Sequence, residues 1–182
     1  MSYDYSENIL VQGVAGDLLH DELGWDLVYA HNQETLGPNG MLGRTDYREV
    51  LLTKYLRPVL FRLNSWMTEA YADSVVKSLL ETSFSATPMQ TNELKYRLIT
   101  GGVPVDFRLP NGNLEKRLAR VIDFDNPAND HFLAVKEMKI HGTLYHRRAD
   151  IIGFVNGIPL LFIELKKMGV DVREAYDNNY HD

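Results

Sequence analysis

Residues 148–167 read RADIIGFVNGIPLLFIELKK and contain two short apolar runs joined by Asn156-Gly157. An Asn-Gly pair between two such runs is a strong signal for a β-hairpin. We therefore expect two antiparallel strands. The runs at 151–155 and 160–163 do not alternate between polar and apolar residues, which predicts that both faces are covered, as in the centre of a sheet with helices packed on it.

Three charged residues stand out beside these runs: Asp150, Glu164 and Lys166. Successive side chains of a strand point to opposite faces, so Glu164 and Lys166 share one face. Two carboxylates without His or Cys nearby suit a hard ion such as Mg²⁺. The Lys166 ammonium could orient or deprotonate the attacking water and offset charge on the phosphorane. The set predicts metal-assisted phosphodiester hydrolysis; an exposed strand end is the alternative for a bare Glu-x-Lys.

The hairpin register decides whether the two carboxylates meet. A two-residue turn would leave Asp150 opposite Ile163. One extra residue in the loop would pair Val155 with Pro159 and set Asp150 opposite Glu164. We favour this second register because proline cannot donate to a strand ladder and tends to lie at strand starts and bulges.

The spacing from Asp150 to Glu164-Leu165-Lys166 resembles the PD-(D/E)xK nuclease motif. The surrounding RRAD and FVNGIPLLFIELKK are similar to the amino-terminal nuclease domain of the restriction (R) subunit of type I restriction-modification enzymes. The similarity extends from about residue 7 onward through LGRTDYREVLLTKYLRPVLFRLN, LITGGVPVDFRLPNG and VIDFDNPANDHFLAVKEMKIHG.

This resemblance implies a restriction-endonuclease-like α/β fold, with a mixed central sheet flanked by helices and the three charges at one edge of the sheet. It also implies that Asp150 and Glu164 bind Mg²⁺, with Mn²⁺ as a substitute, and that Lys166 is the catalytic lysine. Two positions depart from the family pattern. Ala149 stands where proline usually precedes the aspartate, and Asn178 stands where the family has the Gln of a Gln-x-x-x-Tyr element.

The resemblance further implies double-stranded DNA as substrate and methyltransferase (M) and specificity (S) subunits as partners. ATP would be used by a DNA translocase outside this chain, since no P-loop occurs in it. We expect residues 1–182 to form a single nuclease domain, the N-terminal fragment of a longer subunit. A helical block would occupy about 46–99 and the sheet core about 103–166.

Composition supports a module rather than an independent DNA binder. The chain has 182 residues, 45% of them hydrophobic, no cysteine and a formal net charge of −6. An acidic balance disfavours autonomous DNA binding, so other parts of a complex would deliver the module to DNA. The lack of cysteine and of any apolar run near 20 residues leads us to expect a soluble, cytoplasmic protein without membrane contact.

Further residues are candidates for supporting roles. Glu7, on the expected first helix, is a possible additional acid, although a solvated helix face is the commoner role. Basic residues before the catalytic strand, Arg147 and Arg148 among them, could contact the DNA backbone, as could Lys167. A salt-bridged strand edge is the alternative for this basic group.

Along the rest of the chain, apolar periodicity and turn residues predict the remaining elements. We expect helices at 5–22, from a cap at Thr45 or Asp46 to Leu63 with a kink or break at Pro58, and at 68–82, 89–99 and 171–181. We expect strands at 25–29 and 132–140 and a hairpin that pairs 103–109 with 118–124.

Two other functions fit the same sequence. The chain could be a non-catalytic module that keeps a nuclease-like fold to bind DNA or a subunit, or a stand-alone repair nuclease of the same superfamily. Metal binding that depends on Glu164 would distinguish a catalytic from a non-catalytic module.

Overall fold

The computed structural model describes residues 13–83, 85–142, 145–165 and 173. The elements in chain order are α1 (Gly13–Asp17), the π-helical turn η2 (Leu18–Glu22), β1 (Asp26–Tyr29), α2 (Thr53–Leu63), α3 (Glu69–Leu80), α4 (Pro88–Gly101), β2 (Val103–Arg108), β3 (Leu114–Ala119), the 3₁₀ turn η3 (Pro127–Asn129), β4 (Phe132–His141), β5 (His146–Val155) and β6 (Ile158–Ile163). Within these described ranges, no helix is long and apolar enough to cross a bilayer.

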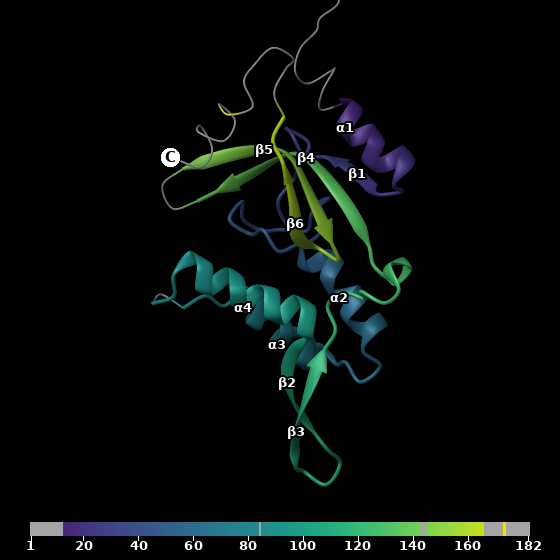
Figure 1. Cartoon of the computed structure of the whole chain (residues 1–182), viewed down its shortest axis with the longest axis vertical. Helices are drawn as coiled ribbons and strands as arrows, with labels where there is room; N and C mark the ends of the chain where they lie inside the picture. The colour runs from purple at the N-terminus through teal and green to yellow at the C-terminus, as the bar shows by residue number, and fades with distance from the viewer. Residues whose placement is uncertain (1–12, 84, 143–144, 166–172, 174–182) are drawn as a thin grey trace, which may run out of the picture.

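A four-stranded sheet in the order β1-β4-β5-β6 forms the centre of the fold. β1 pairs with β4 in parallel, whereas β4–β5 and β5–β6 are antiparallel, so the sheet is mixed. α1 lies beside the sheet at the β1 side, while α2, α3 and α4 lie toward the other end of the molecule (Figure 1). The expected mixed α/β fold is confirmed.

Apolar clusters cover both faces of the inner strands. On one face Leu133 and Phe154 pack with Leu52, and on the other Ala134 packs with Leu19. The expectation of two covered faces is therefore confirmed for β4 and β5.

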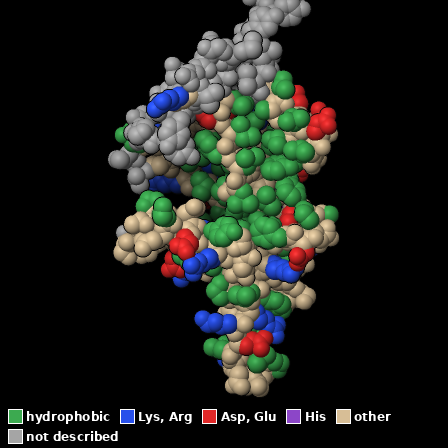
Figure 2. Space-filling view, viewed as in Figure 1, with side chains coloured by type: hydrophobic (Ala, Val, Ile, Leu, Met, Phe, Trp, Pro, Cys, Tyr) green, Lys and Arg blue, Asp and Glu red, His purple; other side chains and the backbone are tan. Residues whose placement is uncertain are grey.

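The same expectation is wrong for β6, which is an edge strand. Leu160, Leu161 and Phe162 are 51%, 39% and 55% exposed. Figure 2 shows apolar side chains gathered over this part of the molecule. In β6, an unbroken apolar run therefore belongs to a strand whose side chains are largely exposed among the described residues.

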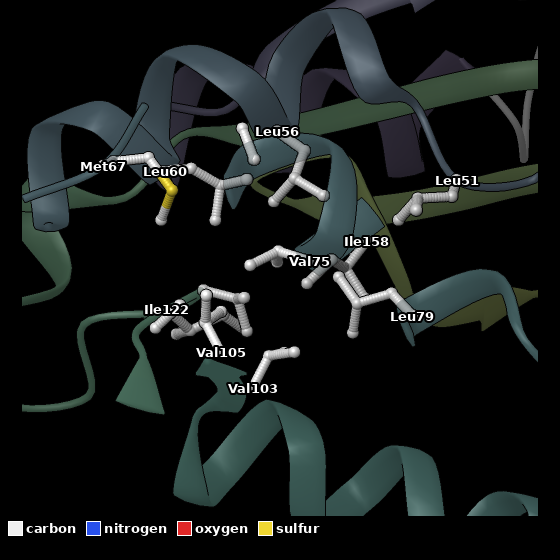
Figure 3. Packing of buried hydrophobic residues seen from close by; sticks show 13 residues of the cluster. Leu51, Leu56, Leu60, Met67, Val75, Leu79, Val103, Val105, Ile122 and Ile158 are labelled. Atoms are coloured by element: carbon white, nitrogen blue, oxygen red, sulfur yellow. The ribbon is translucent and has the colours of Figure 1, made fainter. Parts of the chain in front are cut away.

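A third cluster joins the helices to the sheet. Leu56 and Leu60 of α2 pack with Val75 of α3 and Val103 of β2, and Ile158 at the start of β6 belongs to the same cluster (Figure 3). Ile158 therefore connects the helical part of the fold to the hairpin that carries the candidate site.

Three boundaries differ from those expected. α2 begins at Thr53 rather than at residues 45–46, and it continues through Pro58 without a break.

The second hairpin pairs β2 with residues 114–119, not 118–124, because the 109–113 turn closes with a Leu109 N to Asn113 O bond of 2.8 Å. This hairpin is a separate two-stranded sheet and not part of the central one.

Candidate active site

The hairpin between β5 and β6 turns on two residues. Val155 pairs with Ile158, and the turn residues Asn156 and Gly157 have φ angles of 54° and 78°. Positive φ at both positions is the geometry that Asn-Gly favours between antiparallel strands. The expected extra residue in the loop is therefore wrong.

The extra residue is found within β6 instead. Phe154 pairs with Pro159, but Gly153 pairs with Leu161, so Leu160 is a β-bulge. The bulge shifts the register by one, and Ile151 pairs with Ile163. Continuing this register by one residue sets Asp150 opposite Glu164, which is the arrangement expected from the sequence.

One hydrogen bond fixes the Asp150 carboxylate. The backbone N–H of Leu165 donates to Asp150 Oδ2 at 2.8 Å. Asp150 and Glu164 are both half-buried. The backbone just after β6 thus orients the carboxylate of Asp150 on β5 directly.

The donor set fits a magnesium ion. Two neighbouring carboxylates supply oxygen ligands only, and Mg²⁺ typically takes one or two carboxylates and completes its shell with water and substrate phosphate. Among the described residues, no three His, Asp or Glu side chains form a group that could hold a metal ion by themselves.

Four predicted residues lie outside the described ranges: Lys166, Lys167, Glu7 and Asn178. Their roles stay predictions.

Arg147 and Arg148 lie at the exposed start of β5. The Arg147 guanidinium lies 5.8 Å from the centre of the Tyr145 ring. At the end of the same ribbon the rings of His141 and His146 are 3.9 Å apart. Burial and the neighbouring His146 lower the pKa of His141.

Glu137 of β4 belongs to the site region and was missed from the sequence. Its side chain is 1% exposed, and Oε2 accepts a 2.9 Å hydrogen bond from the Tyr29 hydroxyl, which raises the pKa of Tyr29. In the sequence Glu137 is one charge among several along a strand. No sequence pattern marks it, because the packing of Val135 and Met138 in one cluster, although three residues apart, is seen only in the structure.

Comparisons with known proteins find a matching family and several related proteins. The model of the family "Type I restriction enzyme R protein N terminus" matches residues 4–182. The HindI endonuclease subunit of Haemophilus influenzae is 33% identical over 156 residues, which is 85% of this chain and 14% of that protein. The putative MjaIXP endonuclease subunit of Methanocaldococcus jannaschii is 26% identical over 141 residues, 75% of this chain and 13% of that protein.

The chain thus spans about a seventh of the length of these two curated relatives. A third relative, the EcoprrI endonuclease subunit of Escherichia coli, is 35% identical over 72 residues, 40% of this chain. Since the family match covers nearly every residue, including Asp150 and Glu164, the chain belongs to the family of type I restriction enzyme R protein N-terminal domains.

Proposed function

We propose that this chain is the endonuclease module of a type I restriction enzyme R subunit and cleaves double-stranded DNA. The observation that carries the proposal is the bulge at Leu160, after which Ile151 pairs with Ile163, so that the same register continued by one residue brings Asp150 opposite Glu164. Two like charges in this position are unfavourable unless a cation lies between them. The family match and the endonuclease names of the relatives support the same function.

Asp150 and Glu164 would hold Mg²⁺, and Mn²⁺ could replace it. Bound there, the metal would supply Lewis acidity toward the scissile phosphate and a more acidic water. Lys166, two residues after Glu164, would stabilise the charge that develops on the phosphate. The amide of Leu165 keeps Asp150 in place throughout.

The remaining functions belong to the rest of the enzyme. In this proposal ATP is hydrolysed by a DNA translocase elsewhere in the subunit, and methyltransferase and specificity subunits bring the assembly to its DNA. The net charge of −6 supports this division, because phosphate contacts dominate DNA affinity.

The test compares plasmid cleavage and ATP hydrolysis in the complex that contains the full-length subunit. We expect Asp150→Ala and Lys166→Ala each to reduce cleavage by at least about 100-fold while ATP hydrolysis stays near the wild-type rate. Asp73→Asn, on an exposed face of α3, is the matched control and should leave both activities unchanged. Cleavage that survives both Asp150→Ala and Lys166→Ala would overturn the proposal and favour a non-catalytic module.

A further inference from the structure

Glu137 combines two unfavourable features at one position. Its carboxylate is 1% exposed, and its backbone φ is 52°. Burial of a charge is costly unless the charge is paired, and the left-handed conformation is unfavourable for a residue other than glycine. Strain of this kind concentrates at functional sites.

The position of Glu137 explains the left-handed conformation. The β4–β5 register on either side of Glu137 places it opposite Asp150. Val135 and Met138 pack in the same cluster although three residues separate them, so β4 changes face between them. The conformation of Glu137 makes this change, directly across from the candidate metal ligand.

The Glu137 carboxylate lies close to a second charged side chain, that of Arg148. Oε1 lies 3.8 Å from Arg148 Nη2, while Arg148 Nη1 lies 3.0 Å from His31 Nδ1. His31 Nδ1 also lies 3.4 Å from Glu137 Oε2, so the imidazole, the guanidinium and the carboxylate form one cluster. Arg148 thus lies beside both His31 and the buried Glu137 carboxylate, whose Oε2 accepts a hydrogen bond from the Tyr29 hydroxyl.

Arg148 remains accessible to solvent beside the Glu137 carboxylate. Its side chain is 48% exposed, and no partner within the described part of the chain hydrogen-bonds to Glu137 Oε1. Arg148 precedes Asp150 by two residues on β5. A planar guanidinium can donate two parallel hydrogen bonds to a phosphate, and an adjacent buried carboxylate favours its position here.

We infer that Glu137 is a positioning residue, which orients Arg148 toward a backbone phosphate of the DNA strand bound at Asp150 and Glu164. This inference rests on the proposed nuclease function. Glu137 acts through Arg148 and does not touch the DNA.

A double-mutant cycle on plasmid cleavage by the full-length complex tests the inference. We expect Glu137→Gln to lower the cleavage rate about 10-fold and Arg148→Ala to lower it at least as much, with ATP hydrolysis retained. The double variant should be no slower than Arg148→Ala, because Glu137 has no further role once Arg148 is absent. Additive losses would mean that Glu137 is structural and would overturn the inference, as would an Arg148→Ala enzyme of wild-type rate.

Two further measurements keep the test decisive if Glu137→Gln folds poorly. Tyr29→Phe removes one bond to Glu137 and should slow cleavage about 3-fold, but only when Arg148 is present. Millimolar guanidinium chloride should partly restore cleavage by Arg148→Ala and should not restore it in the double variant, with equal sodium chloride as the salt control. Equal rescue of the Arg148→Ala variant and of the double variant would also overturn the inference.

Matched variants separate this result from other failures. Glu34 is a comparably buried carboxylate that pairs with Arg44. The losses of cleavage rate caused by Glu34→Gln and Arg148→Ala should be additive. Arg57→Ala removes a partly exposed arginine of α2 and should not alter cleavage. If Asp150→Ala still cuts, the proposed function fails; if it does not cut and the cycle is additive, only the role of Glu137 fails.

Discussion

Asn156 shows how much one side chain contributes to the hairpin. It is fully buried, its Nδ2 donates to Val121 O at 2.8 Å and to Asp130 Oδ1 at 2.6 Å, and its Oδ1 accepts from His131 N at 2.7 Å. Asn156→Ala would leave these groups unpaired and place alanine at a positive φ. We expect the free energy of unfolding to fall by about 2–4 kcal/mol, measured by urea denaturation of the 182-residue chain with tryptophan fluorescence.

A second turn offers the control. Asn111 lies in the exposed β2–β3 turn, where its Oδ1 accepts a hydrogen bond from the backbone N–H of Asn113. Asn111→Ala should cost less than about 0.5 kcal/mol. Equal losses for the two alanine variants would show that the buried bonds of Asn156 contribute little.

Residue identity could be predicted where chemistry stands out locally. Asp150 and Glu164 contrast with apolar neighbours, and the β5–β6 register continued by one residue sets them opposite each other. Their role as metal ligands stays a prediction. Glu137 and Arg44 could not be found in this way, because each is a charge that only the tertiary structure buries. Arg44, 1% exposed, forms a buried pair with Glu34 that is invisible in a sequence of otherwise solvated arginines.

At the scale of elements, the bulge in β6 could place the two carboxylates either through the strand register or through the bend that it introduces, and two variants distinguish these effects. Deletion of Leu160 would give a regular ladder that still sets Asp150 opposite Glu164. Insertion of one alanine after Pro159 would displace Glu164 by one residue and turn its side chain to the other face. In plasmid cleavage by the full-length complex, we expect the deletion to stay within about 10-fold of wild type and the insertion to abolish cleavage.

Either reversal would be informative. A folded deletion variant that does not cut would mean that the bend of the bulge, and not the register, places the carboxylates. An insertion variant that cuts at the wild-type rate would contradict the register argument. Circular dichroism spectra of both variants confirm that they are folded.

Element boundaries were predictable where local signals decide them. The helix expected at 68–82 is α3, which Thr68 caps by accepting a hydrogen bond from Tyr71 N. The start of α2 was not predictable, because Arg44 donates to the carbonyls of Tyr47 and Glu49, which a helix would need for its own bonds. A buried guanidinium from outside the segment thus overrides the cap at residues 45–46.

At the scale of the whole molecule, the sheet combines distant segments. β1 pairs with β4 although about a hundred residues separate them, and Asn156 connects the hairpin to the 121–131 segment. Short-range patterns predict the β5–β6 hairpin but not this order. The position of β2–β3 in a separate sheet likewise depends on packing against α3 and not on its own strand pattern.

The stability of the whole domain should fall in two steps on acidification. Burial, with the neighbouring His146, lowers the pKa of His141, so the folded state favours its neutral form. The contribution of His141 is therefore present above the unfolded pKa of about 6.5 and is lost as the pH falls below it.

Hydrogen bonds, first from the Asn129 amide and then from backbone N–H groups, lower the pKa of Asp123. Its contribution is present above the unfolded value of about 3.9 and is lost as the pH falls through the lower folded value. The urea midpoint, measured from pH 8 to pH 3, should therefore decline first below about pH 6.5 and again below about pH 4. His141→Gln should remove the first decline and Asp123→Asn the second; a wild-type midpoint that rises between pH 7 and pH 5 would contradict the His141 assignment.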